Sequence, residues 1–441
     1  MNGVAHRITD LTSRLLGGPL PVRLRAWDGS ESGPAGAPVV VLRSRRALRR
    51  LLWQPGELGL AEAYITGELD VEGDLADGLR GVWRAVRERG LRPPRPRPAD
   101  TRLLLGALGT AARLGALGPK PPSPREQASL SGALHSKSRD RAAISHHYDL
   151  SNAFYALLLD ASMAYSCAYW TADPDHPDAC DDPGTAYGLA DAQRDKLELI
   201  CRKLGLRPGL RLLDVGCGWG SLSLYAAEHH KARVTAVTLA REQAAFVRER
   251  AAERGLADQV EVQLCDYRDL GGGGFDAVAS IEMGEHVGDA EYPAFAARLR
   301  RLVRPRGRVL VQQMSRGRVA PGGGAFIESY IAPDMHMRPL GETVCLLEDA
   351  GLEVRSVQSL REDYVRTVRA WHTTLEERWD DVTALIGPQA ARVWRLYLAG
   401  GALAFEERRM GVDQILAVRP DAEGDSGITG TPAAWFTGER A

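Results

Sequence analysis

Short apolar runs and longer amphipathic stretches alternate along the second half of the chain. The apolar runs predict buried strands, and the longer stretches have the spacing of helices. The predicted strands are 210–215, 234–238, 260–264, 275–281 and 308–313. The predicted helices between them are 220–229, 242–254 and 291–303. Strands that alternate with helices in this way favour an α/β fold with a parallel sheet.

This alternation is interrupted once before it resumes. Residues 316–340 follow neither pattern, and we interpret them as an insertion that covers the substrate. A helix is then predicted to end at Gly351 and a strand to lie near 354–357. Mostly helical sequence continues to Arg409, and a last strand is predicted over 414–418.

The first 120 residues have a different organisation. Residues 38–42 predict a buried strand, and 60–65 predict a short helix that ends before Gly67. Four prolines within 93–98 prevent a helix from continuing. Residues 101–118 predict an amphipathic helix, which either lies at a membrane interface or packs on its own domain.

These patterns divide the chain into three parts. We predict a smaller N-terminal accessory domain over 1–120, a linker over 121–140 and the main domain over 141–441. The six cysteines are scattered and include no C-x-x-C pair, which predicts a reducing compartment and no metal site. No apolar run reaches the length of a membrane span, and the first residues lack a secretory signal.

Charge is distributed unevenly, although the formal net charge of the 441 residues is only −1. Residues 1–150 hold 23 basic and 15 acidic side chains, a net charge of +8, and the remainder has −9. A basic first third predicts an anionic partner, either a membrane surface or a nucleic acid. Only five of the 56 basic residues are lysine, a bias that codon usage in a GC-rich genome explains.

The strongest local motif follows the strand 210–215. Asp214, Gly216, Gly218 and Gly220 form a D-x-G-x-G-x-G loop that leads into a helix. Glycines allow a sharp turn and close approach of a ligand, and the helix N-terminus offers free N–H groups. The dinucleotide spacing G-x-G-x-x-G is absent. The loop resembles motif I of class I methyltransferases that use S-adenosylmethionine, in which the aspartate orients the turn or meets an amino group.

Two neighbouring segments fit the same cofactor. The second strand ends at Thr238 and is followed by Gln243, which we expect to bind ribose hydroxyls. Asp266 and Tyr267 follow the third strand. An acid at this place resembles the adenine contact of methyltransferases.

Several ordered motifs extend the resemblance to one family. They are SHHYDLSNAFY at 145–155, MAYSCAYW at 163–170, LDVGCGWG at 213–220, SIEMGEHVG at 280–288 and EDYVRT at 362–367. Together they resemble the cyclopropane-fatty-acyl-phospholipid synthase family over residues 140–418. The resemblance implies a Rossmann-like class I methyltransferase sheet with a lid insertion. It also implies methylation of a cis double bond in a phospholipid acyl chain, with S-adenosylmethionine as methyl donor and a bound bicarbonate ion as base.

Site residues follow from this resemblance position by position. The cofactor would be held by Tyr165, Ser166, Asp214, Gly216, Gly218, Gly220, Thr238, Gln243, Asp266 and Tyr267. Bicarbonate would be held by Cys167, Glu285, Gln312, the backbone near Met314, and Tyr364. Glu285 would accept the bicarbonate O–H, and Tyr364 and Tyr148 would face the carbocation. The catalytic set is therefore Cys167, Glu285, Gln312, Tyr364 and Tyr148.

Two positions depart from the family pattern. Gln312 stands where cyclopropane synthases typically have histidine, and glutamine donates a hydrogen bond but cannot be protonated. Ala332 stands where the family usually has phenylalanine, which leaves acyl-chain length and bond position open. Relatives that make methylene- or methyl-branched chains also carry glutamine at the first position, so a branched product or another hydrophobic substrate remains an alternative.

The basic first third is then expected to dock on a phospholipid membrane, at the inner face and from the cytoplasm. A homodimer is one assembly state left open. Two other classes of protein were considered. A nucleic-acid enzyme is disfavoured because the arginine runs contain few aromatic residues and no Asn/Asp-Pro-Pro-Tyr/Phe site exists. A lipid-binding module without catalysis would show no turnover.

Overall fold

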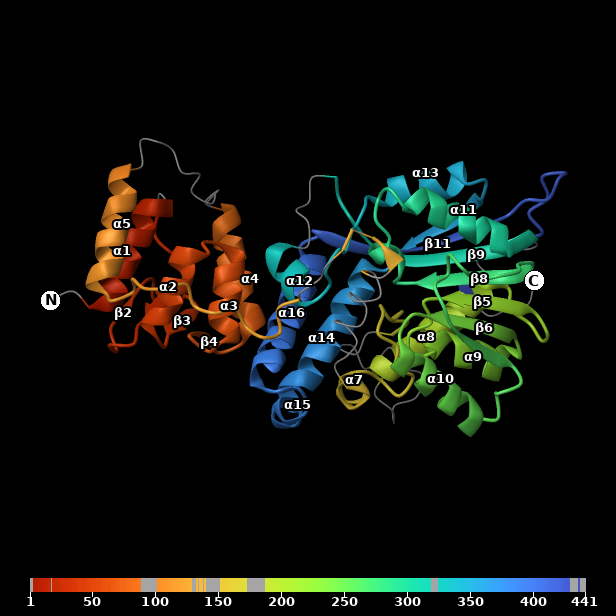
Figure 1. Ribbon diagram of the computed structural model, residues 1–441, viewed down its shortest axis with the longest axis horizontal. Coiled ribbons are helices and arrows are strands. Elements are labelled where there is room, and N and C mark those ends of the chain that lie inside the picture. The colour runs from red at the N-terminus through yellow and green to blue at the C-terminus, as the bar shows by residue number, and fades with distance from the viewer. Residues whose placement is uncertain are drawn as a thin grey trace. The chain divides into compact units, whose positions relative to one another are not determined.

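The computed structural model describes most of the chain. The described residues are 3–16, 18–88, 101–128, 132–133, 135–137, 139, 151–172, 187–318, 324–428 and 435–436. They group into two compact units by contact (Figure 1). The first unit contains residues 1–128, 323–331 and 379–403, and the second contains the remainder. The segments 323–331 and 379–403 fall within the predicted main domain, but by contact they group with the first unit.

The first unit is built on a four-stranded sheet in the order β2-β1-β3-β4. Its strands are β1 (Arg23–Arg25), β2 (Glu31–Ser32), β3 (Val39–Leu42) and β4 (Leu69–Glu72). Its helices are α1 (Val4–Leu16), α2 (Arg45–Trp53), α3 (Glu57–Ile65), α4 (Leu75–Glu88), α5 (Thr101–Arg113), α12 (Gly324–Tyr330), α15 (Trp379–Ile386) and most of α16 (Pro388–Glu406). Ala111, Leu114 and Ala116, at and after the end of α5, are buried, so this end packs on its own unit.

A buried ion-pair cluster ties α2, α3 and the start of β4 together. The Arg50 guanidinium donates to Glu62 at 3.0 Å and to Glu68 at 3.2 Å. All three side chains are almost fully enclosed. Part of the positive charge of the first third is therefore neutralised inside the unit, and Arg50 is not available to an external partner.

The second unit contains a seven-stranded sheet in the order β10-β11-β9-β8-β5-β6-β7. Its strands are β5 (Arg211–Val215), β6 (Arg233–Thr238), β7 (Val260–Leu264), β8 (Phe275–Ile281), β9 (Val303–Arg316), β10 (Glu353–Ser359) and β11 (Met410–Val418). Strands β5 to β9 are parallel, and β11 is antiparallel to both β9 and β10. This confirms the predicted α/β methyltransferase sheet.

Helices cover both faces of this sheet (Figure 1). They are α8 (Leu189–Leu204), α9 (Ser221–His230), α10 (Arg241–Glu253), α11 (Tyr292–Leu302) and α13 (Leu340–Asp349). Two more, α7 (Asn152–Leu158) and α14 (Arg361–Glu377), belong to the same unit. Leu212 and Leu310 belong to the core beneath α8, α9 and α10, while Leu213 and Val311 belong to the core beneath α11 and α13. Successive strand residues point to opposite faces, so each of these strands supplies both cores.

Strand order reverses next to β5. From β5 the chain proceeds to β6 and β7 on one side and then returns to β8 on the other. Open α/β sheets bind ligands at such a switch point, beyond the carboxyl ends of the strands. The loops after β5 and β8 are therefore where the site is expected. Among the described helices, none has the combination of length and hydropathy that crossing a membrane requires.

Candidate active site

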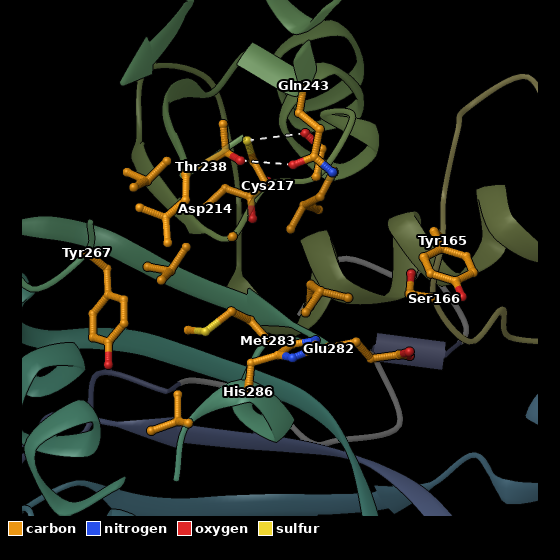
Figure 2. Close-up of a pocket in the computed structure, with 18 of the residues that line it drawn as sticks. Tyr165, Ser166, Asp214, Cys217, Thr238, Gln243, Tyr267, Glu282, Met283 and His286 are labelled. Carbon is orange, nitrogen blue, oxygen red and sulfur yellow. Dashed lines mark hydrogen bonds between the residues drawn. The ribbon is translucent and has the colours of Figure 1, made fainter. Parts of the chain in front are cut away.

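A pocket opens at this switch point, and the glycine loop after β5 forms its floor (Figure 2). Gly216, Gly218 and Gly220 all have positive φ angles, of +80°, +53° and +79°. A side chain at position 216 would also meet Met283, since a Cβ there would lie 2.9 Å from its Cγ. The three predicted glycines thus create the turn into α9 and leave space for a ligand.

Asp214 lies at the end of β5 beneath this loop. It is buried, lines the pocket, and accepts a hydrogen bond of 2.7 Å from Ser223 on α9. Burial raises the pKa of Asp214 to about 6. The predicted role of orienting the turn fits this link between strand and helix.

Thr238 and Gln243 lie on the next strand and helix. The Thr238 hydroxyl donates to Gln243 Oε1 at 2.9 Å, a contact that Figure 2 shows as a dashed line. Gln243 is buried, and its Nε2 has no hydrogen-bond partner among the described residues. A buried donor that lines a pocket and lacks a partner is suited to a polar ligand such as a ribose hydroxyl.

Asp266 and Tyr267 close the far side of the pocket. The Asp266 carboxylate is held by Arg268, whose Nε and NH2 donate at 2.8 and 2.7 Å. This bidentate pair fixes the acid at the pocket wall. A carboxylate has about four acceptor positions, so it still has capacity for an adenine amino group.

Tyr165 and Ser166 line the pocket from the segment before α8. Ser166 accepts a hydrogen bond of 2.9 Å from the Nζ of Lys196, a fully buried lysine on α8 that also lines the pocket. Burial lowers the pKa of Lys196, and the negative charges of Glu282 and Asp214 offset part of this decrease. No local pattern selects Lys196, because α8 precedes every strand that carries a motif.

The residues predicted to hold bicarbonate do not all meet. Three of them converge on Glu282, which follows β8 directly and lines the pocket. Its Oε1 accepts from the Cys167 backbone N–H at 2.7 Å and from Gln312 Nε2 at 2.8 Å. Its Oε2 accepts from the Tyr364 hydroxyl at 2.6 Å. Glu282 was not among the predicted site residues, although its place at the carboxyl end of a central strand was a usable signal.

Glu285 and Met314 form a second, separate contact. The Met314 backbone N–H donates to Glu285 Oε1 at 2.8 Å. Glu285 is buried, and its Oε2 has no partner within the described part of the chain. Burial and the nearby Glu282 raise the pKa of Glu285 to about 8. Burial and the neighbouring carboxylate thus favour the protonated form of Glu285.

Cys167 and Tyr148 are the two remaining residues of the predicted catalytic set. The Cys167 thiol is directed at the carbonyl oxygens of Ala168 and Leu360, at 3.2 and 3.5 Å, and burial raises its pKa well above the ordinary value. Only the Cys167 backbone reaches Glu282. Tyr148 lies outside the described residues.

Gln312 is oriented by further buried amides. Its Oε1 accepts from Gln414 Nε2 at 2.9 Å, and Gln414 Oε1 accepts from Lys203 Nζ at 2.7 Å. Since the amide oxygen of Gln312 faces Gln414, its Nε2 is the atom that donates to Glu282. The series Lys203–Gln414–Gln312 thus fixes the direction of the hydrogen bond at the site.

Several aromatic rings lie next to Tyr364, whose hydroxyl donates to Glu282. Tyr364 packs edge-on to Trp371, with ring centroids 6.2 Å apart, and lies 4.5 Å from Phe405. Tyr165 lies 5.3 Å from Trp371 and 5.7 Å from Tyr155. Such rings stabilise a nearby cation and keep the site apolar.

Comparison with known proteins identifies the chain. Residues 135–415 match the family model described as mycolic acid cyclopropane synthetase. The chain belongs to this family. A probable fatty acid methyltransferase of Mycobacterium tuberculosis is 36% identical over 415 residues, which are 93% of this chain and 94% of the relative. The cyclopropane-fatty-acyl-phospholipid synthase of Escherichia coli is 32% identical over 83% of this chain and 84% of its own length.

Solved structures of the cyclopropane synthetase family share the fold. A mycolic acid cyclopropane synthase solved with S-adenosylhomocysteine (SAH) and CTAB aligns over 63% of this chain and 97% of its own, with 29% identity and a TM-score of 0.57.

Family and pocket together identify an S-adenosylmethionine-dependent methyltransferase. The related synthase was solved with S-adenosylhomocysteine, the product that this cofactor leaves behind. In the present chain, the glycine turn and the unpartnered Gln243 Nε2 fit such a nucleoside ligand. The residues that would hold it are those predicted after β5, β6 and β7, which line one pocket, except Gly220, whose backbone packs against Val247.

Proposed function

We propose that the protein methylates a cis double bond in the unsaturated acyl chain of a phospholipid and closes a cyclopropane ring. The observation that carries this proposal is the position of Glu282, a carboxylate held at the cofactor pocket beside Tyr364 and its aromatic neighbours. A hydrocarbon substrate offers no acidic group before methylation. A buried base among aromatic rings is therefore suited to a reaction that passes through a carbocation.

S-adenosylmethionine, when bound, supplies an electrophilic methyl group. The glycine loop and Gln243 would hold it, with Asp266 at the adenine end. Tyr165, Trp371 and Tyr364 would exclude water and stabilise the positive charge that develops on the acyl chain. An alkene is a weak nucleophile, so this positioning in a dry pocket is the main contribution of the protein.

Bicarbonate, the base that the family resemblance implies, does not fit the described contacts. Cys167 N–H, Gln312 Nε2 and the Tyr364 hydroxyl already donate to Glu282. A second anion at these donors would face a carboxylate at close range, which is unfavourable in a low-dielectric site. No step is assigned to bicarbonate.

We also propose that the first unit brings the enzyme to an anionic membrane surface, on the cytoplasmic side. Leu52, Trp53 and Leu117 are exposed by 40%, 54% and 49%, and the Trp53 indole donates to the Gly118 carbonyl next to Leu117. We call these three residues the Trp53 patch. The exposed basic residues Arg45, Arg113 and Lys120 belong to the same helices and loop. Apolar side chains with adjacent cations suit an interface of anionic lipids.

A methylene-branched chain is the second candidate product, and a methyl-branched chain would require a further two-electron reduction of that methylene by a separate hydride donor. It is supported by the 36% identity to a probable fatty acid methyltransferase. The same acyl cation leads to either product, so the two candidates share substrate and cofactor. They differ in the fate of the electron pair left after deprotonation.

The test uses purified protein, S-adenosylmethionine and vesicles of cis-unsaturated phosphatidylglycerol, with saturated phosphatidylglycerol in parallel. We expect a gain of one CH₂ per modified double bond by mass spectrometry, only with the unsaturated lipid. Proton NMR then distinguishes ring hydrogens from vinylic hydrogens of a methylene group. Equal methylation of the saturated lipid would overturn the proposal.

A further inference from the structure

Glu282 occupies the place at which the family resemblance predicts an external base. We infer that the Glu282 carboxylate is the built-in proton acceptor of the reaction and that catalysis needs no bicarbonate. This inference rests on the proposed function, because it concerns the deprotonation that follows methyl transfer. It goes beyond that function by naming the group that removes the proton.

The hydrogen bonds leave Glu282 with one acceptor position. Oε1 accepts two hydrogen bonds, from Cys167 and Gln312, and Oε2 accepts one, from Tyr364. A carboxylate has about four lone-pair positions. The remaining position is on Oε2, the oxygen next to the Tyr364 ring. A proton taken from a substrate among the aromatic rings would be received there.

The surroundings favour an ionised Glu282 beside a neutral Glu285. Two carboxyl groups this close do not both ionise easily, and Glu285 is the one with its pKa raised to about 8. Glu282 has three donors directed at it and lies within the field of the buried Lys196. Burial raises the pKa of Glu282, which makes it a stronger base than an exposed carboxylate.

The reaction balances with these groups alone. The alkene π electrons form a bond to the transferred methyl carbon while the carbon–sulfur bond breaks, leaving a neutral thioether and a cation on the acyl chain. Glu282 then takes a proton from the added methyl group. The released C–H electron pair closes the cyclopropane ring, or forms an exocyclic double bond if a hydride has first shifted to the original cationic carbon. The carboxylic acid afterwards returns its proton to solvent.

The backbone at Glu282 offers a variant that is expected to fold. Its φ angle is +51°, in the left-handed region that favours glycine. Glu282→Gly therefore removes the carboxylate without adding backbone strain, and it leaves the three donors facing an open space. Glu282→Gln is the second variant, because it keeps the side-chain volume and removes the basicity.

The experiment measures lipid methylation in buffer depleted of carbon dioxide and in buffer with added bicarbonate. We expect the unmodified protein to be equally active in both, and Glu282→Gln to lose about 10²–10⁴-fold in either. Glu282→Gly should be inactive without bicarbonate and partly restored by it. Labelled-bicarbonate carbon NMR should detect saturable binding to Glu282→Gly only. Glu261→Gln, at an exposed carboxylate on β7, serves as the matched control.

The outcomes separate this inference from the proposed function. If the unmodified protein methylates unsaturated lipid but loses activity on bicarbonate depletion, the inference fails and the function stands. Full activity of Glu282→Gln likewise rejects Glu282 as the base. If no unsaturated lipid is methylated under any condition, it is the proposed function that fails.

Discussion

Lys203 donates a hydrogen bond of 2.7 Å from its Nζ to Oε1 of Gln414. Both side chains are buried. Through Gln312, this contact determines which atom faces Glu282. The direction of a hydrogen bond at the reaction centre is therefore set by a lysine two side chains away.

Replacing Lys203 with methionine should change how stability depends on pH. Burial lowers the pKa of Lys203 from 10.5 to about 7. Between these values the unfolded chain binds a proton that the folded chain does not, so this lysine makes stability rise with pH. Thermal unfolding of both proteins from pH 7 to 10 should show a weaker rise for Lys203→Met. Parallel curves would mean that Lys203 titrates normally in the folded protein.

Glu285→Gln should retain activity within about tenfold, because glutamine resembles the protonated acid that neutral pH maintains. It should also alter stability. The pKa of Glu285 is raised from 4.5 to about 8, so across this range the folded state holds a proton that the unfolded state releases, and stability falls as pH rises. The variant should lack this part of the fall when unfolding is followed from pH 5 to 8. A large loss of turnover, comparable with that of Glu282→Gln, would mean that the reaction needs Glu285 as an ionised carboxylate.

Gly218→Ala should weaken cofactor binding as well as lower stability. Position 218 has φ of +53°, and an added Cβ meets no atom within 4 Å, so it would project into the space of the pocket. The backbone cost of a left-handed alanine is about 1–2 kcal/mol. We expect the dissociation constant for S-adenosylmethionine, measured by calorimetry, to rise about tenfold or more. Unchanged affinity would mean that the loop does not contact the cofactor.

The Trp53 patch predicts a defect in vesicle binding. Trp53→Ser combined with Leu117→Ser should reduce sedimentation with anionic vesicles by about tenfold or more, since burying a large apolar side chain contributes about 1.5–3 kcal/mol. Leu264→Ser is the control, because Leu264 is 43% exposed on β7 and lies in the second unit. Equal binding of the patch variant and the control would remove this surface as the docking site.

Periodicity predicted the sheet well because its strands are rich in apolar and β-branched residues and are separated by helical patterns. The predicted limits of β7 and β8 agree with the structure. Strand β9 begins at Val303, five residues before the prediction, since Pro305 and Gly307 do not resemble strand residues. Val303, the first residue of β9, nevertheless pairs with Phe275, the first residue of β8. The grouping of 379–403 with the first unit was not predicted, because an amphipathic pattern does not say which core a helix covers.

Motifs predicted the pocket better than the catalytic contacts. The residues predicted after β5, β6 and β7 line it, apart from Gly220, because strand ends in a parallel sheet share one edge. The family resemblance selected Glu285 as the acidic residue of the site. In the structure it is Glu282, three positions earlier, that accepts the hydrogen bonds from Cys167, Gln312 and Tyr364. Lys196 and Gln414 were missed for a related reason. They contribute through buried polar contacts between distant segments, which no local pattern reveals.

Strand β9 carries two adjacent glutamines with opposite tasks. Gln312 meets Glu282 and Gln414, whereas Gln313 accepts from Tyr292 and donates to Thr343 on the other face of the sheet. A one-residue deletion in this strand would shift its register by one position. The side chains beyond the deletion would then point to the opposite face of the sheet, so the glutamines would lose these partners and the apolar side chains would leave their cores. Homologous chains should for this reason tolerate substitutions along β9 far more readily than changes in its length.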